Sequence, residues 1–190
     1  MSKPKIKSFF SSLTFKKVIW IAPVLYLFHI IEEAVFGFYI FMNKYRGGNS
    51  TYESFLISNT LIMIVYLILI SLFTIYPNRV TAFFNLAGLL AAQFFNAFFH
   101  LIMAIEFGAY CPGLITGLVL YIPYNLILVW MAYREEYITK TMGIIAFLIG
   151  AILMTLFEIE GLNRIVLFGW PTIVIIITII YYFRTSKKTE

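Results

Sequence analysis

Aspartate is absent from this chain, and cysteine and histidine are almost absent, at one and two residues among 190. The single cysteine, Cys111, excludes an internal disulfide bond and a metal site built from several thiolates. Only 12% of the residues are charged, whereas 62% are hydrophobic. A soluble fold of this length could not bury so much apolar side chain, so lipid must solvate part of it. The net charge of +5 arises in the ends and loops, so we expect no nucleic-acid partner.

Long apolar runs alternate with short charged or turn-forming segments along the whole sequence. A helix needs about 17–25 mostly apolar residues to cross a bilayer, and six runs approach or exceed that length. The sequence therefore predicts an all-α fold, a polytopic membrane helix bundle with about six transmembrane helices, in one domain over residues 1–190. The expected helices cover residues 18–43, 54–76, 80–105, 107–133, 141–157 and 165–183.

Lysine and arginine are distributed unevenly between the two sides of this predicted topology. Eleven of the 14 lie in the two terminal segments and in the loops on the same side as those termini. Because cytoplasmic loops are enriched in Lys and Arg, both termini are expected in the cytoplasm. The first apolar run is too long for a secretion signal and lacks a small-residue cleavage site after it, so we expect a retained helix.

Ionisable side chains interrupt the first and third apolar runs. At bilayer depth such groups cost about 2.5–3.5 kcal/mol and usually face the protein interior or a wet cavity. His29 lies three residues before Glu32 and four before Glu33, so both carboxylates can approach its imidazole. Asn96 and His100 show the same four-residue spacing on the third run, on a face of small residues. These two faces are expected to meet inside the bundle.

The fourth run carries further polar groups to the same layer. Counted at roughly 1.5 Å per residue from the outer helix ends, Glu33 and Asn96 lie roughly 15 Å deep and His100 roughly 10 Å deep. Thr116 and Tyr121 fall at similar depth on the descending fourth helix. The sequence thus predicts one polar layer in the outer half of the membrane.

Three short motifs occur in a recognisable order along the chain. They are His29-Ile30-Ile31-Glu32-Glu33, then Ala91 followed by Asn96 and His100, then Pro112-Gly113 followed by Thr116. This order resembles the HXXEE family of bacterial integral membrane proteins, whose function is unknown. The resemblance extends from the first helix through the fourth. It implies a multi-pass protein of the bacterial cell membrane and supports one shared site, but it implies no substrate.

A metal-dependent intramembrane enzyme is the first hypothesis for this site. A lone histidine would be explained as a packing residue, but two histidines and two glutamates at matching depth favour chemistry. Two His and one Glu form a familiar zinc or iron ligand set with a position left open. A lipid or another apolar molecule entering from the bilayer would be the substrate. The metal ligands would be His29, Glu33 and His100, the general base Glu32, and the substrate or second-shell groups Asn96, Thr116 and Tyr121.

Two other functions remain open on the sequence alone. A proton-coupled transporter could use His29, Glu32 and Glu33 as a proton relay, because neighbouring carboxylates cannot both ionise cheaply. However, no inverted repeat is visible, and a transporter of six helices would need to form an oligomer such as a dimer. A non-catalytic subunit of a membrane complex would explain the helices but not the polar cluster. The H-E-x-x-H spacing of zinc proteases is also absent.

Overall fold

All secondary structure in the described part of the chain is helical. The computed structural model describes residues 13–158 and 163–186. In these residues six segments are long and apolar enough to cross a membrane, so the predicted fold class is confirmed. The helices in chain order are α2 (Phe15–Val18), α3 (Ile21–Phe36), α4 (Phe38–Arg46), α5 (Tyr52–Ile75), α6 (Arg79–Leu89), η1 (Leu90–Phe95), α7 (Asn96–Phe107), α8 (Leu114–Thr116), η2 (Gly117–Tyr121), α9 (Ile122–Arg134), α10 (Lys140–Glu158) and α11 (Asn163–Ser186).

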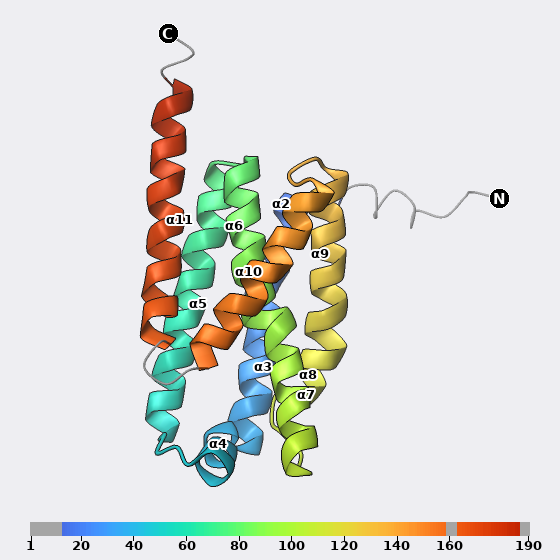
Figure 1. Cartoon of the computed structure of the whole chain (residues 1–190), viewed down its shortest axis with the longest axis vertical. Helices are drawn as coiled ribbons and strands as arrows, with labels where there is room; N and C mark the ends of the chain where they lie inside the picture. Colours follow the sequence, from blue (N-terminus) through green and yellow to red (C-terminus); the bar gives the residue numbers. More distant parts are fainter. Residues whose placement is uncertain (1–12, 159–162, 187–190) are drawn as a thin grey trace, which may run out of the picture.

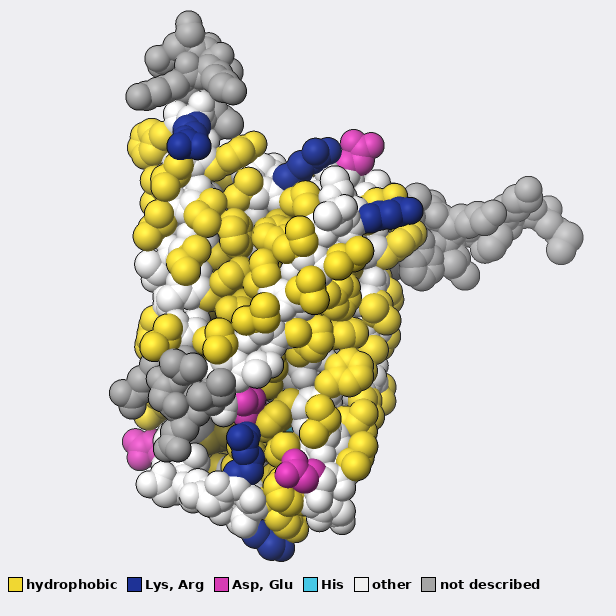
Figure 2. All heavy atoms as spheres, in the orientation of Figure 1, with side chains coloured by type: hydrophobic (Ala, Val, Ile, Leu, Met, Phe, Trp, Pro, Cys, Tyr) yellow, Lys and Arg dark blue, Asp and Glu magenta, His cyan; other side chains and the backbone are white. Residues whose placement is uncertain are grey.

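The spans stand side by side, and α10 crosses the bundle obliquely (Figure 1). The short helix α4 lies across one end of the bundle, where its aromatic rings contact Phe107 at the end of α7 (Figure 1). The last turns of α11 extend beyond the other helices at the opposite end (Figure 1). Hydrophobic side chains cover the middle of the molecule, and charged side chains gather towards its two ends (Figure 2). This surface is that of a multi-pass membrane protein.

The first span is shorter than predicted. The apolar pattern suggested one helix over residues 18–43, but α3 ends at Phe36 and a new helix starts at Phe38. Gly37 adopts a left-handed conformation with φ +73°, which ends α3, and its carbonyl accepts from the N–H groups of Ile40 and Phe41. Residues after the break are still apolar, so hydropathy alone did not locate it.

The fourth span starts later than predicted. Residue 107 was expected to open it, but Phe107 closes α7, and Gly108 follows in a left-handed conformation with φ +58°. Helical structure resumes only at Leu114, so residues 108–113 form a loop between the two spans. Because this loop is mostly apolar, the hydropathy of the sequence did not distinguish it from the adjoining helices. The other spans lie within a few residues of their predicted bounds.

Two π-helical segments widen the helices around the polar layer. η1 lies in the third span and η2 in the fourth, where it ends just before Pro123. Proline has no N–H, so the carbonyl four residues earlier, that of Val119, loses its usual helical partner, and a wider turn here accommodates that loss. Such segments are frequently found at functional sites.

A buried hydrogen-bond ladder joins α3, η1 and α9. The side-chain amide of Gln93 donates to the Ala22 carbonyl at 3.0 Å. The Asn125 amide donates to Gln93 Oε1 at 3.1 Å and to the Tyr121 carbonyl at 2.9 Å. Interhelical bonds of this kind stabilise membrane bundles because lipid offers buried amides no alternative partner. The ladder thus fixes the three helices that carry the polar layer.

One face of α10 packs tightly on the third span while another faces lipid. Gly143, Ala146, Gly150 and Met154 are buried, whereas Ile144, Leu148 and Ile152 are more than half exposed. A Cβ added to Gly150 would lie 3.0 Å from the Leu90 Cβ and 3.1 Å from the Ala91 nitrogen. Small residues let membrane helices approach this closely.

The Gly150→Leu substitution is therefore expected to destabilise the protein by about 1–3 kcal/mol, because the backbone of η1 cannot move aside. Thermal unfolding in detergent, followed by circular dichroism, measures the change. Gly169→Leu on α11 is the control, since the nearest atom to a Cβ there is 3.9 Å away. Equal melting temperatures for the two variants would contradict this account of the α10 contact.

Candidate metal centre

Three buried side chains converge between α3 and α7. The Glu33 Oε1 atom lies 3.5 Å from His29 Nε2 and 3.3 Å from His100 Nε2. The three candidate ligand atoms all lie within 4.8 Å of one another. The three residues are 5% exposed or less. The prediction that helices one and three turn these groups towards each other is confirmed.

The other ring nitrogen of each histidine contacts a group that lies beside a backbone carbonyl. Thr116 Oγ1 lies 2.8 Å from His29 Nδ1, and its hydroxyl can donate to the Gly113 carbonyl at 3.4 Å. Cys111 Sγ lies 3.3 Å from His100 Nδ1, and its thiol can donate to the Pro112 carbonyl at 3.9 Å. With the ring hydrogens on Nδ1, the histidines donate to these two groups and each ring presents an Nε2 lone pair to Glu33.

Cys111 lies outside the group of three converging ligand atoms. Its sulfur contacts the opposite ring nitrogen of His100, Nδ1, at 3.3 Å. Burial raises the pKa of the Cys111 thiol to about 12, with nearby glutamates adding to the shift. The thiol contact restrains the orientation of the His100 ring.

Gly113 lies directly against both imidazole rings. An added Cβ would lie 2.6 Å from His100 Cε1 and 2.7 Å from His29 Cε1. Its φ of +97° also belongs to a region that favours glycine. Only a residue without a side chain lets the loop backbone close over the two rings.

Glu32 is occupied by hydrogen bonds from the loop and the start of α8. Its Oε1 accepts from the N–H groups of Gly113 at 3.0 Å and Ile115 at 3.1 Å, and its Oε2 accepts from the Thr116 N–H at 2.7 Å. The Tyr110 hydroxyl also donates to Oε1. Burial, followed by this bond to Glu32, raises the pKa of Tyr110, which keeps the phenol protonated as a donor. Glu32 therefore anchors the residue 110–116 segment over the histidines.

Aromatic rings enclose the histidines. Tyr121 lies over the His29 ring, with centroids 4.7 Å apart, and Phe38 lies 5.1 Å from the His100 ring. The two imidazoles meet edge to face at 5.0 Å. Among the described residues the Tyr121 hydroxyl has no hydrogen-bond partner. These contacts restrict both rings to one orientation.

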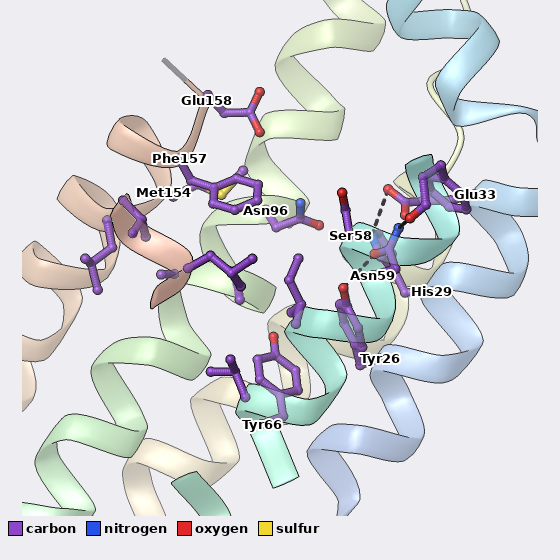
Figure 3. Close-up of a pocket in the computed structure, with 18 of the residues that line it drawn as sticks. Tyr26, His29, Glu33, Ser58, Asn59, Tyr66, Asn96, Met154, Phe157 and Glu158 are labelled. Atoms are coloured by element: carbon purple, nitrogen blue, oxygen red, sulfur yellow. Dashed lines mark hydrogen bonds and ion pairs between the residues drawn. The ribbon is translucent and has the colours of Figure 1, made fainter. Parts of the chain in front are cut away.

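A large cavity opens beside the three converging side chains. It has a volume of about 1090 Å³, and His29 and Glu33 form part of its wall. In Figure 3, Asn96 on α7 lies beside Phe157 of α10 and points towards Ser58 on α5. The Asn96 Oδ1 atom has no hydrogen-bond partner in the part of the chain that the structure describes.

The residues predicted for the site occupy three different positions. His29, Glu33 and His100 form the central group, and Thr116 and Tyr121 contact His29. Asn96 lines the cavity, and Glu32 binds the loop. Sequence reasoning missed three contributors, of which the first two lie just before α8 and could have been sought there: Tyr110, Cys111 and Phe38. Gly113 was noted as part of a motif, but its contact with both rings was not predicted.

Comparisons with known proteins agree with these motifs. The family model described as "Protein of unknown function with HXXEE motif" matches residues 20–128, more than half of the chain. The chain is also 31% identical over 136 residues to "Uncharacterized protein YrkK" of Bacillus subtilis (strain 168), covering 67% of this chain and 83% of that protein. No solved structure matches the chain.

The Gly113→Ala substitution is expected to displace the loop from both rings, because a methyl group cannot occupy a space 2.6–2.7 Å from ring carbons. We expect a lower melting temperature and metal affinity reduced at least about tenfold. Gly108→Ala is the matched control, since Gly108 is also left-handed, with φ +58°, but nothing lies within 4 Å of its Cβ position. If both variants lose the same stability, backbone strain rather than ring contact explains the effect.

Proposed function

Since the chain belongs to the family of HXXEE-motif proteins of unknown function, its chemistry has to be inferred from the site, and we propose that it is a metal-dependent enzyme acting within the membrane. The proposed ligands are His29 Nε2, His100 Nε2 and one Glu33 oxygen. Zinc or iron fits this nitrogen and oxygen donor set. The proposed substrate is a lipid or another apolar molecule that enters from the bilayer.

The observation that carries this proposal is that three hydrogen-bond acceptors, two imidazole nitrogens and one carboxylate oxygen, face one another. Both Nε2 atoms lack a hydrogen-bond partner among the described residues, and Glu33 Oε1 faces both. Lone pairs in a buried site repel one another unless a cation lies between them. Either a metal ion or a proton could be that cation. The separations of 3.3 and 3.5 Å between Glu33 Oε1 and the two Nε2 atoms favour the metal ion. A proton shared between imidazole and carboxylate gives a separation of about 2.7–2.9 Å.

The two separations from Glu33 Oε1, 3.5 and 3.3 Å, fit a tetrahedral ion, and all three ligand atoms lie within 4.8 Å of one another. Ligand atoms about 2.0–2.1 Å from such an ion lie roughly 3.3–3.4 Å from each other. Three protein ligands leave the fourth position for water or substrate, which is the usual composition of a catalytic zinc site. Thr116 and Cys111 would then be the partners that orient the two histidine ligands.

The side chains around the proposed ligands have separate functions in this proposal. An ion bound here would supply a Lewis acid that polarises a carbonyl. Asn96 and Ser58 line the adjoining cavity and would orient a polar substrate group. We propose that Glu32 is a positioning residue, because it already accepts bonds from three backbone N–H groups. The general-base role predicted for Glu32 would require breaking some of these bonds.

Elemental analysis of the purified protein tests the proposal directly. The protein should carry an affinity tag without histidine, so that the tag binds no metal. We expect about one zinc or iron per wild-type chain. The Glu33→Gln variant should bind at least about 100-fold more weakly, because loss of a ligand should exceed the 10–100-fold cost of losing its outer partner.

The control for this experiment is Glu158→Gln, since Glu158 lines the same cavity but lies outside the three-residue group. This variant should keep its metal. Wild-type protein that stays metal-free after incubation with zinc and with ferrous iron would overturn the proposal. If such protein also carried protons into vesicles and Glu33→Gln did not, the proton-coupled transporter would replace the enzyme.

Glu32→Gln separates a positioning role from a base role. Glutamine offers one acceptor oxygen where the loop needs two, so the variant should unfold about 1–3 kcal/mol more easily and bind metal more weakly. Chemical denaturation and metal titration give the two readouts. Glu106→Gln serves as the control because Glu106 is exposed on α7. Unchanged stability and metal affinity, with activity alone lost, would instead assign Glu32 to proton transfer.

A further inference from the structure

The cavity beside the metal centre is long and runs along the bundle. Its wall on α5 extends from Ser54 to Ile70, which corresponds to roughly 24 Å along the helix. Its volume of about 1090 Å³ lies at the upper end of the range for small-molecule sites. An ion, a proton or water alone would not require a space of this length. The dimensions fit a chain-like molecule.

The lining changes character from one end of the cavity to the other. The end beneath α4 is polar, the middle holds the metal centre and uncharged polar groups, and the far end is mainly apolar. The polar end contains Arg46, Asn49, Ser50, Ser54 and Glu158, and the middle contains His29, Glu33, Ser58, Asn59 and Asn96. The far end contains Leu69, Ile70, Leu89, Leu167 and Pro171, together with the polar side chains of Tyr66, Asn85 and Trp170. This order matches an amphiphile with its head beneath α4 and its chain in the interior.

The charges at the polar end are already balanced. Arg46 and Glu158 form an ion pair at 2.7 Å, and each is partly shielded from solvent. Among the described lining residues, Arg46 is the only cation, so no spare positive charge awaits a phosphate or sulfate. The head group that fits best is therefore uncharged.

Polar atoms without partners mark where the ligand carries its own polar groups. The Tyr66 side chain is 4% exposed and lines the cavity, yet its hydroxyl has no hydrogen-bond partner within the described ranges. Tyr66 packs on Tyr26, with ring centroids 4.9 Å apart, one helical turn below His29. Asn96 Oδ1 is likewise unpartnered. In Figure 3, Asn96 lies near the level of His29 and Glu33, whereas Tyr66 lies further along the cavity, beyond Tyr26.

We propose that the cavity holds one single-chain, uncharged acyl ester of the monoacylglycerol type. The inference rests on the proposed function, because it places the ester carbonyl beside His29, Glu33 and His100. The chain would then extend from the level of Ser58 towards Ile70, roughly 18 Å. Hydrolysis adds water across the ester: the carbonyl carbon gains a hydroxyl, its bond to the alcohol oxygen breaks, and a proton goes to that oxygen. No oxidant or reductant is needed.

Photo-crosslinking tests the occupant without relying on catalysis. The probe is a monoacylglycerol with a diazirine in its acyl chain, and the labelled peptides are mapped by mass spectrometry. We expect saturable labelling of cavity residues such as Ile62 and Leu167, reduced by excess unlabelled monoacylglycerol. Met154→Trp fills the cavity and should reduce this labelling at least about fivefold. Ile152→Trp, on the lipid-facing side of the same helix, should not reduce it.

Metal content, measured on the same samples, separates the two proposals. Both tryptophan variants should retain the metal, since neither residue contacts the three ligands. If the protein contains metal but its labelling is non-saturable, or is equal in the two variants, the proposed ligand is wrong. The proposed metal centre is then unaffected. Saturable labelling of a metal-free protein supports the ligand and overturns the metal-dependent enzyme. If Met154→Trp does not fold, Ser58→Leu narrows the cavity from the opposite wall and must reduce labelling in the same way.

Stronger saturable labelling by a diazirine fatty acid than by the monoacylglycerol would contradict the uncharged head group. The two probes differ in the charge of the head and share the chain. Labelling is therefore compared at equal probe concentrations in the membrane, measured for each probe.

Discussion

Two imidazoles and a carboxylate face each other in the interior of this bundle, and the surrounding structure maintains that arrangement. His29 Nε2, His100 Nε2 and Glu33 Oε1 lie within 4.8 Å of one another. With the ring hydrogens on Nδ1, all three atoms are acceptors, and without a cation such a group is unfavourable in a medium of low dielectric constant. The cost of keeping the three together must therefore be met by contacts elsewhere, and the structure shows which contacts these are. The cluster is supported from three sides.

Support comes from the loop, from the helix contacts and from the polar ladder. Glu32 fixes the residue 110–116 segment, whose Thr116 and Cys111 in turn fix the two imidazole tautomers. Gly113 brings that segment into contact with the rings. Gln93 and Asn125 join α3, η1 and α9 beneath the site. Adjacent carboxylates in one motif thus perform different tasks, because successive helical residues point about 100° apart.

The spans and the central cluster were predictable from the sequence because both depend on local periodicity. Apolar runs define the membrane spans, and the four-residue spacing of His29 and Glu33 places them on one helical face. The break at Gly37 was missed because the residues on both sides are apolar, and a left-handed glycine leaves no mark in hydropathy. The bonds to Glu32 and the position of Cys111 depend on how a distant loop folds back, which no local pattern encodes. The cavity is likewise a product of how five separate segments pack.

The segments that build the centre are distributed along the chain in a way that constrains how the protein is made. His29 emerges first during translation, His100 follows two spans later, and Thr116 is added only as the fourth span begins. At the proposed site, all three ligands would therefore be available to an ion only after most of the chain has been made and inserted. The helices α10 and α11, which form part of the cavity wall, are made later still, so the ligand atoms can assemble before the cavity is complete. Binding of an ion and closure of the cavity would then be separable stages of maturation.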